Sequence, residues 1–176
     1  MTGVGSEADF LEQVAREFRS YRRTAEKALA QVDEGALFRQ LDPESNSLAV
    51  IARHVGGNLR SRFTDFLTTD GEKPDRRRDG EFESPGSRAE LMTGWETGWA
   101  ALEGTLAALT PADLARTVTI RDEPHTVVRA LLRALAHVAL HVGQIVFLAK
   151  HLAGPGWQTL SIPRGQSQGW KPTPRR

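Results

Sequence analysis

Two histidines one helical turn apart are the residues in this chain whose types and spacing could do chemistry. His137 and His141 lie four residues apart in an otherwise apolar stretch. At this spacing on a helix, Cβ atoms are roughly 5–6 Å apart, so two neutral imidazoles can bind one metal ion. His54 is a candidate third ligand from elsewhere in the chain. The spacing alone is weak evidence, since five randomly placed histidines would produce it in roughly one chain in ten.

The composition limits the chemistry that such a site can use. The chain has 176 residues, enough for one domain with a substantial core, and it has no cysteine. A metal must therefore be held by nitrogen and oxygen ligands, and disulfides and a cysteine nucleophile are excluded. With 23 basic and 22 acidic residues, no net field attracts nucleic acid or an anionic membrane, so we expect neither partner. No basic stretch followed by an apolar run opens the sequence, and no window approaches the ~18 apolar residues of a membrane span. We therefore expect a cytoplasmic protein.

Four long helices are predicted to position the histidines, because apolar residues recur at steps of three and four. The first helix should open at Ser6 with a capping box and end near Gly35. Asn46 or Ser47 should cap the second helix, with His54 beside its apolar stripe.

A glycine pair and a long charged loop interrupt this pattern. Gly56-Gly57 lies inside the second helix, where each glycine costs about 1 kcal/mol relative to alanine, which indicates either close helix approach or room for a ligand. Residues 70–86 form a loop longer than usual for a structureless connection, which is typical of functional or mobile loops. Within it, Arg76 to Arg78 stand between the acidic residues Asp75, Asp79 and Glu81, so we expect a solvated loop rather than an anion site.

The second half of the chain completes the bundle. Ser87 should cap a third helix as part of a capping box, and Thr117 to Ile120 should form the first arm of a small hairpin that turns through residues 122–124. The fourth helix should run from about Thr126 to Ala153, with His137 and His141 on a stripe next to its apolar seam. The predicted fold is an all-α four-helix bundle over residues 1–153, followed by an irregular, partly docked tail at residues 154–176. Further apolar residues on the fourth helix suggest burial on several sides and a dimer contact.

Two amides lie one turn or less from the histidines and are candidate cofactor-binding residues. Asn58 follows His54 by four residues, and Gln144 follows His141 by three. Either amide could orient a ligand or touch a substrate. Alternatively, each is an ordinary polar residue on the surface of its helix. The histidines themselves have an alternative role as neutral side chains bonded to these amides or to water.

Three segments resemble the DinB-like family, also called the YfiT-like metalloenzymes: Ser45–Asn58, His137–Ile145 and Leu160–Gly165. The resemblance extends over nearly the whole chain and is strongest to a subfamily of unestablished function. It implies an up-down-down-up four-helix bundle, commonly a homodimer, with a divalent ion, often nickel or zinc. Carried onto this sequence, the metal ligands are His54, His137 and His141. Thiol-dependent relatives make S-transferase or isomerase activity the sharper implication.

The sequence supports three hypotheses. In the first, the protein is a metal-dependent S-transferase, isomerase or hydrolase acting on a small molecule, with any thiol supplied by a low-molecular-weight cofactor because the chain has no cysteine. In the second, it is a non-enzymatic dimeric stress-response or binding protein with a structural metal or none. In the third, no metal binds and the histidines serve the bundle alone. The sequence identifies no catalytic acid or base.

Overall fold

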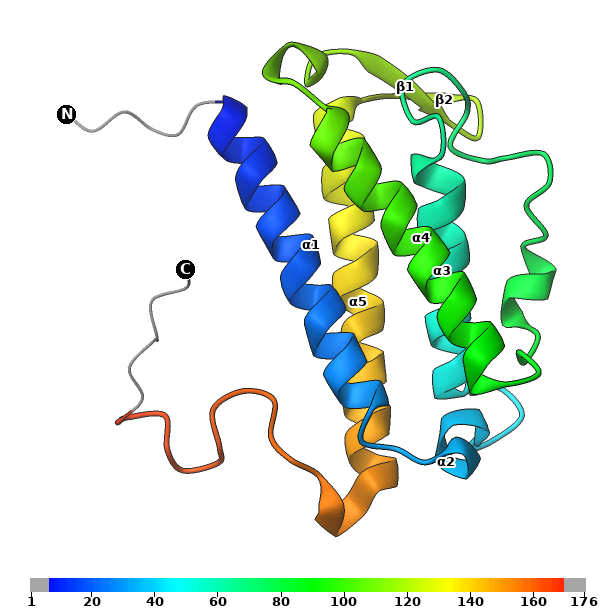
Figure 1. Ribbon diagram of the computed structural model, residues 1–176, viewed down its shortest axis with the longest axis vertical. Coiled ribbons are helices and arrows are strands. Elements are labelled where there is room, and N and C mark those ends of the chain that lie inside the picture. Colours follow the sequence, from blue (N-terminus) through cyan, green and yellow to red (C-terminus); the bar gives the residue numbers. More distant parts are fainter. Residues whose placement is uncertain (1–6, 170–176) are drawn as a thin grey trace.

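The computed structural model, which describes residues 7–169, contains four long helices and one small hairpin (Figure 1). The long helices are α1 (Glu7–Leu29), α3 (Leu48–Phe63), α4 (Arg88–Ala108) and α5 (Val127–Ala153). The short elements are α2 (Glu34–Phe38), η1 (Asp79–Phe82), η2 (Pro111–Asp113), η3 (Gly154–Gly156), β1 (Thr117–Ile120) and β2 (Glu123–Thr126). This confirms the predicted helical bundle with a hairpin before the last helix. The predicted cap Ser6 and the end of the tail lie outside the described residues.

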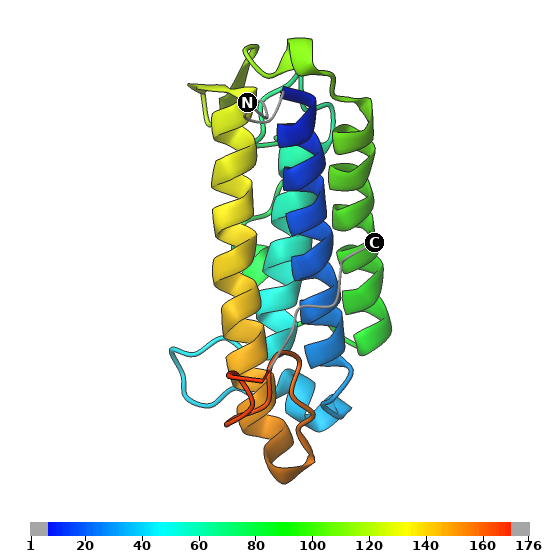
Figure 2. The same ribbon diagram turned by 90° about the vertical axis from the view of Figure 1, so that its left-hand side faces the viewer.

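The long helices follow an up-down-down-up order. Helices α1 and α5 run in one direction along the bundle, and α3 and α4 run in the other (Figures 1 and 2). Helix α3 packs against α4 and α5, while α1 packs chiefly against α5. Because α3 and α4 are parallel, the connection between them, residues 64–87, must return along the length of the bundle. This return brings η1 alongside α3.

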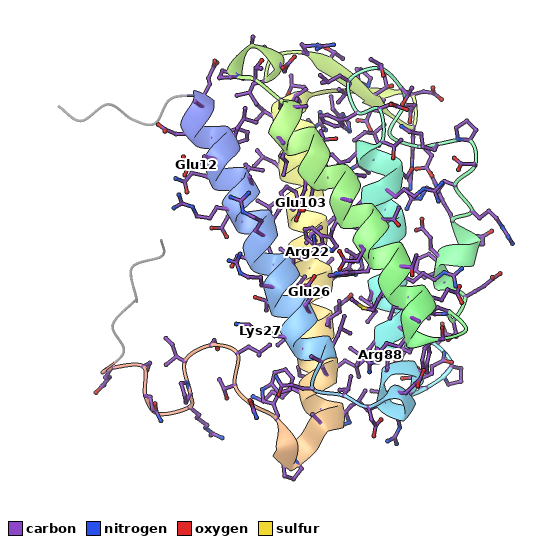
Figure 3. The ribbon with its side chains drawn as sticks, in the orientation of Figure 1. Glu12, Arg22, Glu26, Lys27, Arg88 and Glu103 are labelled. Atoms are coloured by element: carbon purple, nitrogen blue, oxygen red, sulfur yellow. The ribbon has the colours of Figure 1, made fainter. Side chains whose placement is uncertain are left out.

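The first helix ends earlier than predicted. Helix α1 stops at Leu29, and Gly35 lies inside the separate short helix α2. The Arg88 guanidinium, from the start of α4, donates to the carbonyl oxygens of Leu29 at 3.3 Å and Val32 at 2.8 Å (Figure 3). These bonds satisfy carbonyls that the end of a helix leaves without partners. The predicted boundary was wrong because a residue distant in sequence stabilises this end.

The other long helices begin where their capping residues predict. The Ser47 hydroxyl accepts from the Val50 amide at 3.2 Å, which decides between the two predicted caps. Ser87 accepts from the Glu90 amide at 3.2 Å, but the Glu90 carboxylate bonds to the Gly86 amide rather than to that of Ser87. At α4, the bond from the backbone to the serine forms as a capping box requires, whereas the glutamate bonds one residue earlier, at Gly86 instead of Ser87.

The hairpin forms as predicted, with a tighter turn. Strands β1 and β2 are antiparallel with Ile120 opposite Glu123, so the turn is Arg121-Asp122 and residues 123 and 124 belong to the second strand. Both turn residues have positive φ, 58° and 61°, as a two-residue type I′ turn requires. The Asp70 carboxylate accepts from both of their amides at 2.9 Å. The connection between α3 and α4, residues 64–87, is called the return loop below. It fixes a turn that the residue types of Arg121 and Asp122 alone do not favour.

Close packing of α3 on α4 explains the first glycine of the pair. A Cβ added to Gly98 would lie 2.2 Å from the carbonyl oxygen of Gly56, and one added to Gly56 would lie 2.9 Å from that of Gly94. Both contacts involve backbone atoms, which cannot move aside. Of the two predicted explanations, close helix approach is confirmed at Gly56.

Helix α5 is more apolar than the sequence reading allowed. Within Val127–Gly156, an 18-residue window has a mean hydropathy of 1.6, so this helix is long and apolar enough to cross a membrane by length and composition, and the expectation that no window approaches this was wrong. The core helix of a soluble protein passes the same test. Here α5 packs against α1 and α3 within the bundle, and 33% of the apolar window is buried, so this single helix is weak evidence for a membrane span.

Candidate metal centre

The three predicted histidines lie together between α3 and α5. The Nε2 atom of His137 is 3.1 Å from Nε2 of His54 and 3.2 Å from Nε2 of His141. The potential ligand atoms of all three rings lie within 4.8 Å of one another. The i,i+4 spacing on α5 places two rings side by side, and the packing of α3 against α5 supplies the third.

Hydrogen bonds orient two of the rings. His54 Nδ1 lies 3.0 Å from Oε2 of Glu81, and His141 Nδ1 lies 2.7 Å from Oε1 of Gln144. A carboxylate and an amide oxygen can only accept, so each ring carries its proton on Nδ1. In the neutral rings, the lone pairs on Nε2 then point at His137.

Two of these rings remain neutral at ordinary pH. Burial lowers the pKa of His137 to about 3, and repulsion from His141 and His54 contributes. Burial also lowers the pKa of His141, although its hydrogen bond with Gln144 opposes the shift. Neutral imidazole is the form that binds a metal.

The arrangement of the three rings can accommodate a divalent cation. One N–H on His137 Nε2 can point at only one of its two neighbours, which leaves a second short nitrogen–nitrogen approach unsatisfied. Tetrahedral zinc with Zn–N bonds of 2.0–2.1 Å requires nitrogen–nitrogen separations of about 3.3–3.4 Å. The observed 3.1 and 3.2 Å are close to these values. Within residues 7–169, this cluster contains three ligands, the number at which a catalytic site keeps an open position.

One ring atom is left without a visible partner. His137 Nδ1 is buried and has no hydrogen-bond partner among the described residues. Metal-binding histidines usually donate this N–H to a carboxylate, a carbonyl or water. Of the three rings, His137 is therefore the one that the surrounding described side chains orient least.

Glu81, which the sequence reading did not single out, is the central residue around the histidines. It lies in η1, is 7% exposed, and accepts from Arg76 Nε at 2.7 Å and Arg76 Nη2 at 2.8 Å as well as from His54. Burial raises its pKa, but the hydrogen bonds from Arg76 and His54 outweigh this and keep the pKa below its usual value. Glu81 therefore remains a carboxylate and holds the proton of His54 on Nδ1.

The return loop also corrects the prediction for Arg76. Its side chain is 6% exposed and pairs with Glu81 and Glu72, so it does not belong to a solvated loop. Gly57 leaves the space that Glu81 occupies, since a Cβ there would lie 2.7 Å from Oε1 of Glu81. The second glycine of the pair was the sequence signal for this carboxylate. Phe82, beside it, stacks on the His54 ring with centroids 5.0 Å apart.

The two predicted amides lie at different places. Gln144 is bonded to His141, as an orienting group would be. Asn58 is buried on α3 and lines a cavity of about 340 Å³ that also reaches His54 and His137. The rest of this cavity is lined by apolar side chains, guanidinium groups and two carboxylates: Phe63, Phe66, Phe82, Ile120, Ala130, Ala134, Arg62, Arg76, Arg78, Arg121, Arg133, Asp79 and Glu81.

His125 and His151 do not join the cluster. His125 is 2% exposed, with Nδ1 2.7 Å from the Pro124 carbonyl oxygen, so its role is structural. His151 is exposed near the end of α5.

Comparison with known proteins supports the family resemblance at a coarse level. A family model described as "Protein of unknown function (DUF1572)" matches residues 6–166, nearly the whole chain. No curated protein matches the chain significantly. The chain therefore belongs to the DUF1572 family of proteins of unknown function, which is a DinB/YfiT-like family.

Proposed function

We propose that the protein is a divalent-metal-dependent enzyme that acts on a small molecule, with His54, His137 and His141 as the metal ligands. The observation that carries the proposal is the convergence of three Nε2 atoms beside a cavity of about 340 Å³. That volume is at the lower end of the range for ligand sites, roughly 300–1,000 Å³. Nickel and zinc are the expected ions, because imidazole suits both.

When bound with an open coordination position, such an ion supplies a nucleophile at neutral pH by lowering the pKa of water or of a thiol. S-transfer, isomerisation and hydrolysis all fit this chemistry. The thiol of an S-transferase would come from a low-molecular-weight cofactor, since the chain has no cysteine.

The side chains of the site have distinct roles in this proposal. Glu81 and Gln144 keep the protons of His54 and His141 on Nδ1, so that both Nε2 atoms face the ion. Asn58 lines the cavity beside His54, where it can hydrogen-bond a substrate. The apolar side chains of the cavity limit the access of water to the reacting group.

Metal analysis of protein purified without a histidine tag tests the proposal. After loading with nickel or zinc, we expect one ion per chain in the wild type and in His151→Ala, and none in His137→Ala. Free-thiol loss from glutathione mixed with a small electrophile then tests for turnover. A wild-type protein without stoichiometric metal would refute the proposal, and a metal that gives no turnover with thiol, ester or isomerisable substrates would favour a non-enzymatic role.

An exposed apolar stripe fits the homodimer that the family resemblance implies and that the second hypothesis, a dimeric binding or stress-response protein, requires. Leu132, Leu140 and Phe147 lie on one face of α5 and are 48%, 63% and 79% exposed, so the predicted burial on several sides of α5 does not occur within one chain. We propose that this face forms the homodimer contact in a cytoplasmic protein. Sedimentation equilibrium of the wild type and of Phe147→Ser tests it, and a monomeric wild type would refute it.

A further inference from the structure

We propose that the cavity beside the three histidines contains an oxyanion subsite, in which Arg62 and Arg133 bind the carboxylate or phosphate group of the substrate. As a statement about the substrate, this inference rests on the proposed function. As a binding site, it can be tested without a metal. The substrate class that follows is a small organic anion with an apolar body.

Arg62 is a buried cation with unused hydrogen-bonding capacity. Its side chain is 9% exposed, it lines the cavity, and its Nη1 is buried with no hydrogen-bond partner among the described residues. Oε2 of Glu72 lies 3.3 Å from Nη1, close enough for an ion pair but not aligned as a hydrogen bond. Buried guanidinium N–H groups normally have partners, so this group indicates a missing acceptor.

The surrounding charges do not supply that acceptor. Four arginines form ion pairs with the single carboxylate of Glu72: Arg62, Arg76, Arg78 and Arg121. Glu81, a buried carboxylate, is shared between Arg76 and His54. Burial lowers the pKa of Arg62 to about 10, and the nearby arginines contribute to this shift. Five arginines line the cavity against two carboxylates, Glu81 and Asp79, so its wall carries more positive than negative charge, and an anion would relieve the repulsion.

Arg133 is held in place without a carboxylate. Its Nη1 donates to Nε2 of His125 at 2.9 Å, and His125 Nδ1 bonds to the Pro124 carbonyl oxygen. Among residues 7–169, no carboxylate lies within ion-pair distance of Arg133. A guanidinium oriented by a neutral ring and facing a cavity keeps its charge available for a ligand.

The apolar wall indicates the rest of the ligand. Phe63, Phe66 and Ile120 line the same cavity, together with His54 and His137. A molecule with its anionic group on the arginines and its body against these side chains would reach the histidines. This arrangement orients a substrate toward the proposed open coordination position.

Calorimetric titration of metal-free and zinc-loaded protein tests the subsite, with acetate, butyrate, hexanoate and inorganic phosphate as probes. We expect an anion to bind the wild type in both forms, and binding about tenfold weaker or more in Arg62→Gln and in Arg133→Gln. The matched controls are Arg60→Gln and Arg129→Gln, whose side chains are 61% and 67% exposed on the same two helices. These controls should bind like the wild type. Melting curves identify a variant that does not fold. If Arg62→Gln does not fold, the affinity of Arg133→Gln for the anion tests the subsite.

The probes distinguish the two sources of the oxyanion. An apolar wall should tighten binding about fourfold for each methylene from acetate to hexanoate, which would assign the subsite to carboxylates. Phosphate bound more tightly than hexanoate would assign it to a phosphate ester. The inference is overturned if neither the carboxylates nor phosphate bind the metal-free protein. It is also overturned if the control variants lose as much affinity as Arg62→Gln and Arg133→Gln. Anion binding without stoichiometric metal would refute the proposed metal function and leave the subsite standing.

Discussion

Replacing Glu81 with glutamine tests whether the return loop tunes the histidine site. Glutamine keeps the size of the side chain and removes its charge. In the wild type, the carboxylate accepts the Nδ1 proton of His54 at 3.0 Å and two hydrogen bonds from Arg76. A carboxylate on Nδ1 makes Nε2 a stronger ligand, and an amide does so less well. We therefore expect Glu81→Gln to bind metal more weakly.

The size of the effect follows from the contacts. The bond from His54 to a charged acceptor is worth about 1.5–3 kcal/mol, which corresponds to a loss of about 10–100-fold in metal affinity. The fold should survive the substitution. Arg76 loses one buried partner but keeps Glu72 at 3.2 Å, so we expect a destabilisation of about 1–3 kcal/mol rather than the 3–5 kcal/mol of a fully broken buried pair.

Competition titration with a chromophoric chelator measures the zinc affinity of each variant. Glu83→Gln is the matched control, because Glu83 is exposed in the same loop two residues away. Urea melts of the metal-free proteins separate the loss of affinity from the loss of stability. A folded Glu81→Gln protein that binds zinc within twofold of the wild type would refute the role assigned to Glu81.

Three further predictions concern the metal, the pH dependence and the helix contact. Protein with zinc at 1,000 times its Kd should melt about 8–16 °C higher than protein stripped of zinc by a chelator. Such binding adds about 4 kcal/mol of stability, and each kcal/mol is worth about 2–4 °C in a protein of this size. Identical melting curves would contradict a metal site. Because the pKa of His137 is lowered to about 3 in the folded protein, the unfolded state binds more protons below about pH 6.5, so metal-free stability should fall as the pH drops from about 6.5 toward 3. Urea melts at pH 7 and 5 should show that His137→Leu loses less free energy of unfolding than the wild type does. An equal loss in both proteins would count against the lowered pKa of His137. Gly98→Ala should destabilise the protein by about 1–3 kcal/mol or more, since its Cβ would lie 2.2 Å from the Gly56 carbonyl oxygen. The control Gly104→Ala, on the same helix, meets nothing within 4 Å and should stabilise the protein by about 0.5–1 kcal/mol. Equal melting temperatures for the two variants would refute the close contact.

Local sequence patterns were sufficient for much of the helical framework. Helix periodicity and capping depend on residues within four positions of one another, so Ser47, Ser87 and Thr126 marked the starts of three long helices correctly. The i,i+4 spacing of His137 and His141 is local in the same sense. It places both rings on one face of α5 in any context where that helix forms.

Other features depended on contacts that no local pattern contains. The end of α1 is set by Arg88, more than 50 residues away in sequence, and the hairpin turn is held by Asp70. The glycine pair indicated that something close to α3 required space. It did not identify α4 at Gly56 or Glu81 at Gly57, because both neighbours arrive through the fold.

The sequence by itself determined four helices, the caps of three of them and a pair of histidines one turn apart on the last helix. The family resemblance named His54 as a third ligand, but local pattern could not bring it to that pair across 83 residues of sequence, and only the tertiary structure revealed the buried carboxylate that orients it. The physical reason is the parallel arrangement of α3 and α4. Their connection must run back along the bundle, and there it brings Glu81 and its charged neighbours to the open side of the histidines.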